Sequence, residues 1–122
     1  MADALPAKVQ RKLWRGDSRT WTHVFTTGDP AEPVDLTGHT FTAQFRVDKN
    51  RGEVVCESVC AVTEPGVVVE TLTSVEADKL PGEVEGEDAP RVYWDLQSVD
   101  GDGERHTWLY ADVQVKGDRT HG

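Results

Sequence analysis

The strongest constraint on the fold is the regular alternation of side chains in residues 40–47, directly after a turn built on Asp35, Thr37 and Gly38. The apolar positions are Phe41, Ala43, Phe45 and Val47, and the polar positions between them are Thr40, Thr42, Gln44 and Arg46. A period of two places these two sets on opposite faces of an extended chain. The segment therefore predicts a β-strand with one buried face and one solvated face.

Similar segments recur along the chain, with turns between them. They predict strands over residues 20–27, 53–63, 67–72, 91–99 and 104–116. Thr73 and Glu76 have the spacing of a capping box, which predicts one short helix over Ser74–Lys79. The expected fold is therefore all-β: an antiparallel, Ig-like β-sandwich of six to seven strands with one short helical turn.

Length and charge divide the chain unequally. Its 122 residues suffice for one domain, which we place at residues 15–120, after an N-terminal arm of residues 1–14 in which Ala7–Trp14 is expected to form a short helix or a strand. Residues 1–19 carry five basic side chains against two acidic ones, a net charge of +3. Because the whole chain has a net charge of −9, the other 103 residues carry −12. This acidic body argues against a general affinity for nucleic acid.

Hydropathy gives no sign of a membrane or secretion signal. No apolar run approaches the roughly 18 residues of a membrane span. The N-terminus lacks the apolar core of a signal peptide, so we expect the protein to be made and folded in a cytoplasm.

The two cysteines are expected to be free thiols. Cys56 and Cys60 lie in one predicted strand, which separates their Cα atoms by about 13 Å at ~3.3 Å per residue. A disulfide requires less than ~7 Å. Both side chains point to the same face, and a C-x-x-x-C spacing alone does not make a metal site. We therefore expect core thiols in a reducing compartment rather than a metal or redox site.

No arrangement of residues typical of catalysis is found along the chain. The four histidines share no short spacing: they are His23, His39, His106 and His121. No Ser or Cys has the context of a nucleophile elbow. Residues 100–104 resemble a calcium loop, but predicted strands flank them and favour a hairpin turn. The sequence therefore predicts a non-enzymatic protein with no catalytic residues, cofactor or metal.

The order of several short motifs supports a more specific interpretation. In chain order they are Arg15-Gly16-Asp17, the strand Trp21 to Phe25, the segment Pro33 to Gly38 with its strand, the capped turn 73–80, the strand Tyr93 to Leu96, an Asp-Gly turn and a final Val-x-Val strand. Over residues 15–120 this order resembles the small β-sandwich at the N-terminus of phage baseplate upper proteins, which also occurs as free-standing short proteins among phage structural genes.

This resemblance implies a structural protein of a tailed bacteriophage virion, assembled in the host cytoplasm. Such a protein packs against other virion proteins in the tail or baseplate region, often as a homo-oligomer of three or more copies. No nucleic acid or membrane is expected among its partners.

The arm is the expected contact with those partners. The residues that we expect to form this contact are Leu5, Val9, Arg11, Lys12, Leu13 and Trp14. Deletion of residues 2–13 is then expected to leave the monomer folded and to abolish assembly. Two alternatives stay open: a capsid decoration protein at capsid symmetry axes, and a carbohydrate- or cell-surface-binding module that uses one of the four tryptophans.

Overall fold

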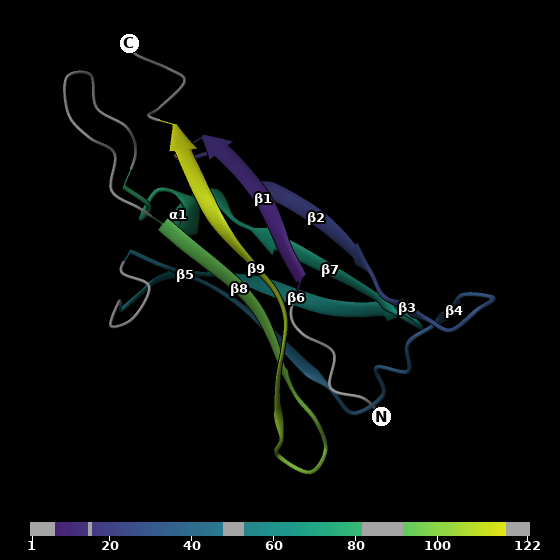
Figure 1. Cartoon of the computed structure of the whole chain (residues 1–122). Coiled ribbons are helices and arrows are strands. Elements are labelled where there is room, and N and C mark those ends of the chain that lie inside the picture. Colours follow the sequence, from purple (N-terminus) through teal and green to yellow (C-terminus); the bar gives the residue numbers. More distant parts are fainter. Residues whose placement is uncertain (1–6, 15, 48–52, 82–91, 117–122) are drawn as a thin grey trace.

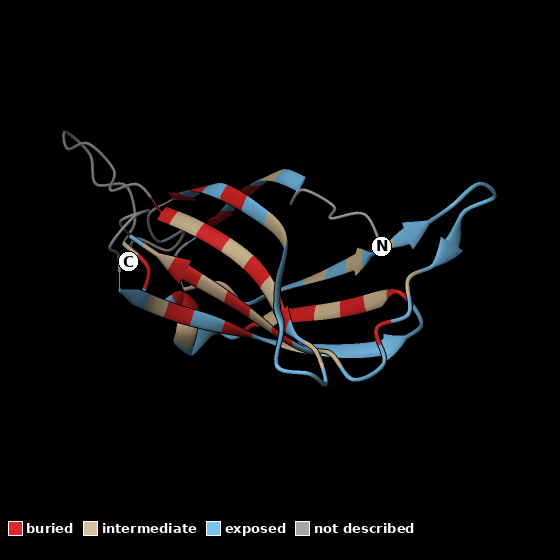
Figure 2. Ribbon diagram, turned by 60° about the horizontal axis from the view of Figure 1, so that its bottom comes forward, coloured by how far each residue is buried: buried red, intermediate tan, exposed pale blue. Residues whose placement is uncertain are grey.

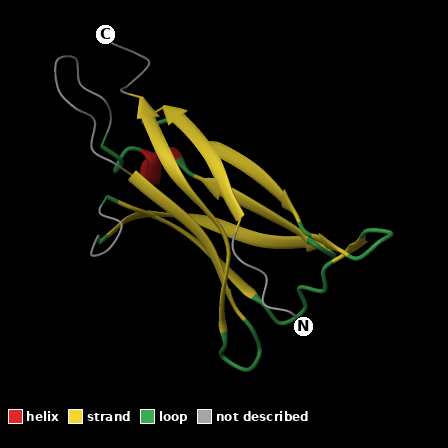
Figure 3. Ribbon diagram, viewed as in Figure 1, coloured by secondary structure: helices red, strands yellow, loops and turns green. Residues whose placement is uncertain are grey.

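The computed structural model describes residues 7–14, 16–47, 53–81 and 92–116 (Figure 1). These residues form nine strands and one short helix (Figure 3). In chain order the elements are β1 (Ala7–Trp14), β2 (Arg19–Val24), β3 (Thr26–Thr27), β4 (Glu32–Pro33), β5 (Thr40–Arg46), β6 (Val54–Glu64), β7 (Val67–Leu72), α1 (Ser74–Ala77), β8 (Val92–Val99) and β9 (Arg105–Lys116). The predicted all-β class is confirmed. No helix among the described residues is long and apolar enough to cross a membrane.

Seven of the strands form one curled sheet in the order β1-β9-β8-β5-β6-β7-β2, and β3 pairs with β4 in a small separate ribbon. Every pair in the large sheet is antiparallel except β1 with β9, which is parallel. The sheet is thus mixed rather than purely antiparallel. The parallel pair joins the first and last strands, and such a pair needs a long connection, here provided by the rest of the domain.

The long strand β6 connects the two halves of the sheet. Its residues Val54–Ser58 pair with β5, and its residues Val59–Glu64 pair with β7. The two halves are therefore continuous through β6 and curl around a shared core, rather than forming two detached sheets. Curling also brings the two ends of the sheet together: β1 and β2 lie side by side (Figure 1), and Arg19 Nη1 donates to the Lys12 carbonyl oxygen at 3.3 Å.

The core lies on the inner face of the curled sheet, and along β5 and β8 buried positions alternate with half-buried ones (Figure 2). Phe41, Ala43 and Phe45 of β5 are buried, as the alternation predicts. Across the sheet, Phe45 pairs with Trp94 and Ala43 with Leu96 of β8, so large and small side chains interdigitate.

Helix α1 is shorter than predicted. Thr73 caps it and accepts a hydrogen bond from the Glu76 backbone N–H at 3.3 Å, as the capping box requires. The Glu76 carboxylate, however, accepts from the Glu57 backbone N–H of β6 at 3.1 Å and pairs with Lys79. After Asp78 the backbone hydrogen bonds run from Lys79 to Glu76 and from Leu80 to Ala77, an i to i−3 pattern, so the α-helix ends before Lys79.

Residues 7–14 are part of the sheet, which corrects the expectation of an arm separate from the domain. β1 pairs with β9 in register from Ala7–Leu109 to Trp14–Lys116. Leu13 is only 1% exposed and belongs to the core. From Val9 onward, buried or half-buried residues alternate with exposed ones along this strand, and β1 covers the β9 side of the sheet. A deletion of residues 2–13 would remove this strand from the folded domain.

Candidate functional site

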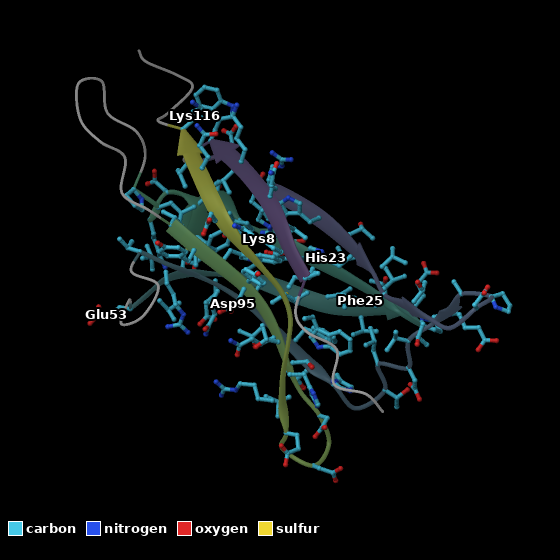
Figure 4. The ribbon with its side chains drawn as sticks, viewed as in Figure 1. Lys8, His23, Phe25, Glu53, Asp95 and Lys116 are labelled. Atoms are coloured by element: carbon cyan, nitrogen blue, oxygen red, sulfur yellow. The ribbon has the colours of Figure 1, made fainter. Side chains whose placement is uncertain are left out.

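A buried carboxylate holds together four strands of the curled sheet. Glu70 of β7 is 0% exposed and accepts hydrogen bonds from side chains on three other strands. Arg11 Nη1 of β1 donates to Oε2 at 2.9 Å, and Arg11 Nη2 pairs with Oε1. His23 Nε2 of β2 lies 2.8 Å from Oε1 (Figure 4), and Trp94 Nε1 of β8 donates to Oε2 at 3.1 Å. A carboxylate only accepts, so Nε2 of His23 carries the hydrogen. We call Arg11, Trp21, His23, Glu70 and Trp94 the Glu70 cluster.

Two indole rings enclose the charged partner of Glu70. The Arg11 guanidinium carbon lies 3.7 Å from the ring centroid of Trp21 and 3.4 Å from that of Trp94. Burial lowers the pKa of Arg11, but its hydrogen bonds and charge interaction with Glu70 oppose that effect, and arginine stays protonated in proteins. The stacked rings supply a cation–π interaction where water is excluded.

The same contacts hold Glu70 in its ionised form. Burial alone would raise the pKa of Glu70, but the hydrogen bonds from His23 and Arg11 outweigh it, and the pKa is lowered to about 2. The carboxylate therefore has no proton to give at neutral pH, and its two oxygens are engaged by three donor side chains. The cluster is suited to clamping strands, not to acid–base catalysis.

A second group of polar and aromatic side chains lies near the β8–β9 turn. Ser98 Oγ of β8 lies 2.8 Å from His39 Nδ1 and accepts from Trp108 Nε1 of β9 at 2.9 Å. His106 Nε2 lies 3.0 Å from Asp100 Oδ2, and the rings of His39 and His106 have centroids 5.5 Å apart. We call His39, Ser98, Asp100, His106 and Trp108 the Ser98 cluster.

A register shift between Leu96 and Gln97 accounts for part of this arrangement. Leu96 pairs with Leu109, but Gln97 pairs with Thr107, so Trp108 is the additional residue of a β-bulge. Its ring packs on Phe25 and Phe41, with centroids 5.0 and 6.0 Å away. No short spacing in the sequence indicates this cluster, because a bulge and distant strands bring its members together.

The Ser98 cluster contains the residue types of a catalytic triad without its connections. Ser98 is 1% exposed, and its hydroxyl is held by Trp108 and His39. Asp100 contacts His106 and not His39, and hydrogen bonds from His106 and its own turn hold its pKa below the usual range. A substrate cannot reach the serine, and among the described residues no carboxylate is hydrogen-bonded to His39. Among the described residues, no group of three or more His, Cys, Asp or Glu side chains is placed to hold a metal ion.

The prediction of two free thiols is confirmed, with Cys56 buried and Cys60 half-buried. Both point inward from β6, two residues either side of the buried Ser58. Burial raises the pKa of each thiol to about 12. The reactive thiolate is therefore scarce at neutral pH.

The residues that were expected to contact partners differ in how far they are buried. Arg11 and Leu13 are buried inside the chain, a correction to that expectation, because they face the core from β1. Val9 is half-buried, whereas Lys12 and Trp14 are exposed, Trp14 at 40%. Leu5 lies outside the described residues. In the sequence, Arg11 has the pattern of a surface cation. Its buried partner Glu70 is 59 residues away along the chain, so no local pattern connects the two.

Comparison with known proteins adds little to these observations. No family model matches the sequence, and no curated protein matches it. Among solved structures, the chain is similar to murine CRIg with 11% sequence identity and a TM-score of 0.38, over 91% of this chain and 93% of that one. A likeness at this TM-score carries no argument about function, and the all-β class follows from the strands themselves.

Proposed function

We propose that this chain is a non-enzymatic structural protein of a tailed bacteriophage virion that packs against other virion proteins in the tail or baseplate region. The resemblance of residues 15–120 to the β-sandwich of phage baseplate upper proteins suggests this role. Within the particle, the chain is then a homo-oligomer of three or more copies.

The observation that carries the proposal is that the central polar groups of the two clusters, Glu70 and Ser98, are engaged inside the fold. The Glu70 carboxylate is saturated by Arg11, His23 and Trp94. The Ser98 hydroxyl is enclosed by Trp108 and His39. These contacts tie strands together and favour a rigid building block over an active site.

The outward side chains of β1 support a role in assembly. The backbone edges of β1 and β2 face each other where the sheet curls, so these edges are not offered to a neighbour, but the outward side chains of β1 are exposed. Lys12 and Trp14 are exposed on β1 and remain candidates for partner contact.

Two alternative roles, capsid decoration and glycan binding, differ from the proposed one in where the protein is found and in what it binds. Capsid decoration would use the same rigid domain at a different place in the particle. A glycan-binding module is favoured less, because Trp21, Trp94 and Trp108 all make internal contacts. Trp14 is the more exposed tryptophan, and a glycan-dependent change in its fluorescence would favour that module.

The test is to locate the protein in particles. An antibody raised against the purified chain would be applied to density-purified particles from the source lysate, by immunoblot and by immunogold electron microscopy. We expect the chain in the particle fraction, with gold at the tail or baseplate. Gold over the capsid would favour decoration, and a chain present in the lysate but absent from particles would overturn the proposal.

A further inference from the structure

Two histidines of the Ser98 cluster lie close together near the β8–β9 turn. The ring centroids of His39 and His106 are 5.5 Å apart. His39 belongs to the segment before β5, and His106 belongs to β9. A Cβ atom added at Gly38 would lie 3.9 Å from the backbone nitrogen of Gly101, so the turns of these two segments also lie side by side. Histidine is the commonest metal ligand among side chains, which makes this pair a candidate for a metal site.

One nitrogen of each ring is held by a polar partner. Asp100 Oδ2 lies 3.0 Å from His106 Nε2, and because a carboxylate only accepts, Nε2 carries the hydrogen. The neutral His106 ring therefore has its lone pair on Nδ1. His39 Nδ1 lies 2.8 Å from Ser98 Oγ, which has lone pairs to accept from both His39 and Trp108. Histidines that bind metals are held in the same way, because their second ring nitrogen donates to a nearby oxygen.

The other nitrogen of each ring is left for an ion. Among the described residues, neither His39 Nε2 nor His106 Nδ1 has a hydrogen-bond partner. His39 is half-buried, and Ser98 and the rings of Phe41 and Trp108 hold it in place. The His106 side chain is 46% exposed, which leaves its ring room to turn toward an ion held by His39.

The spacing of the two rings agrees with a tetrahedral ion. At a metal–nitrogen distance of about 2.1 Å, each ring centroid lies roughly 3.2 Å from the ion. Two rings at the tetrahedral angle then have centroids about 5.2 Å apart, whereas neighbouring rings on an octahedral or square-planar ion are about 4.5 Å apart. The observed distance of 5.5 Å is close to the tetrahedral value. Zinc is the ion that proteins bind in this geometry with imidazole ligands.

A cleft opens beside His39. It has a volume of about 400 Å³ and is lined by residues 35–39 and 62–65. Asp35 and Glu64 line it and are exposed, and hydrogen bonds from the hydroxyl and backbone N–H of Thr37 hold the pKa of Asp35 below its usual range. Carboxylates that line a cleft raise the local concentration of cations. The cleft therefore gives an ion a path from solvent to the His39 ring.

We propose that His39 and His106 bind one Zn²⁺ ion, His39 through Nε2 and His106 through Nδ1. Ser98 and Asp100 are positioning residues, because each holds the hydrogen of one ring on the nitrogen that does not bind the ion. Among the described residues, no third His, Cys, Asp or Glu side chain is placed to complete the site, so water fills the two remaining positions. The ion links the segment before β5 to β9. This inference goes beyond the virion role and does not depend on it.

The site is tested by isothermal titration calorimetry of the full chain with Zn²⁺ alone, in a buffer that does not bind zinc. Because the chain supplies half of the ligands of a structural zinc site, we expect one ion per chain and a Kd on the order of 10 µM. His106→Gln keeps a hydrogen-bond donor for Asp100 but has no ring nitrogen, and it should weaken binding at least about tenfold. The matched control is His121→Gln, which should bind zinc like the wild type. Circular dichroism checks that all the chains are folded.

Asp100→Asn tests the positioning role. The asparagine oxygen still accepts from the backbone of the turn, so its NH₂ group faces His106 Nε2 and moves the ring hydrogen to Nδ1. We expect the affinity for Zn²⁺ to fall about tenfold or more, with little change in the unfolding midpoint in the absence of zinc. An unchanged affinity would overturn the positioning role of Asp100.

NMR spectroscopy of the ring nitrogens identifies the ligands in the wild type, so the test does not rely on variants alone. On addition of Zn²⁺, we expect the ¹⁵N shifts of His39 Nε2 and His106 Nδ1 to change most and those of His23 least. A wild type that binds no zinc at about 1 mM of the ion would overturn the inference. Binding that is unchanged in His106→Gln, or equally weakened in His121→Gln, would place the ion elsewhere and overturn it as well. Shifts confined to one of the two rings would exclude a site built from both histidines.

Discussion

The Glu70 cluster and the Ser98 cluster use the same residue types for contacts of very different consequence. Each contains a tryptophan indole N–H, a histidine and a carboxylate, and their members Trp94 and Ser98 are only four residues apart on β8. In the Glu70 cluster the carboxylate is fully buried and an arginine is buried beside it. In the Ser98 cluster the buried group is a neutral hydroxyl, and the contact of the Asp100 carboxylate with His106 is partly open to solvent.

Burial of charge, more than the type of residue, therefore decides how much each cluster contributes to the free energy of unfolding. A buried ion pair is costly to break because the remaining charge has no water. A buried hydroxyl costs less, and an exposed pair less again. We therefore expect substitutions to rank in that order, and the predictions below test the ranking.

The largest effect is expected from deletion of residues 2–13. It removes β1, with the buried side chains of Arg11 and Leu13, and leaves Glu70 ionised without its main cation. We expect the truncated chain to lose cooperative unfolding, measured by circular dichroism and size-exclusion chromatography. Deletion of residues 2–6, which keeps β1, is the control and should unfold like the full chain. A truncated 14–122 chain with an unchanged unfolding midpoint would show that β1 is dispensable.

Substitution of the buried carboxylate alone should come next. Glu70→Gln keeps the shape but leaves the Arg11 charge buried without a counter-ion, and we expect a loss of about 3–5 kcal/mol in the free energy of unfolding. The double variant Arg11→Met, Glu70→Leu removes both charges and should be milder than Glu70→Gln. Urea denaturation measures both. Asp112→Asn breaks the exposed Lys8–Asp112 pair and should cost less than about 1 kcal/mol.

The pH dependence of stability isolates the same carboxylate. The pKa of Glu70 is about 2 in the folded chain against an ordinary value of 4.5. As pH falls below 4.5 the unfolded chain takes up a proton before the folded one does, so stability is lost between about pH 4.5 and 2. The loss is roughly 3 kcal/mol. Urea denaturation across this range should show a flatter curve for Glu70→Gln, and parallel curves would contradict the assignment.

The two clusters are the part of the structure that the sequence did not predict. Local alternation sufficed to predict β5 and β8, and the capping spacing sufficed to locate the start of α1. Local alternation did not place β1 in the sheet, because a charged residue, Arg11, stands at an inward position of that strand. Only its buried partner Glu70 explains why an arginine is found there. Both Arg11–Glu70 and His39–Ser98 join residues 59 apart. The first pair depends on the curl of the sheet and the second on the pairing of β5 with β8, and neither periodicity nor spacing reveals these.

Within the Ser98 cluster, Ser98→Ala should have an intermediate effect. It removes the acceptor of the Trp108 indole N–H and the partner of His39. A half-buried donor left without a partner costs about 1–3 kcal/mol, and we expect the lower part of that range because Trp108 is near solvent. Urea denaturation measures the loss, and Thr42→Ala on the outer face of β5 serves as a control. A loss as large as that of Glu70→Gln would contradict the ranking by buried charge.

The smallest effect is expected from Asp100→Asn. The contact of Asp100 with His106 is partly exposed to solvent, and such surface contacts contribute little to stability. The turn itself should persist, because Oδ1 of Asp100 accepts from the backbone N–H groups of Asp102 and Glu104 at 2.9 and 3.0 Å, and an asparagine oxygen accepts equally. We therefore expect little change in the free energy of unfolding, measured by urea denaturation at two salt concentrations, since salt screens interactions between exposed charges. A salt-independent loss as large as that of Glu70→Gln would mean that the two clusters are energetically alike, and that exposure does not separate them.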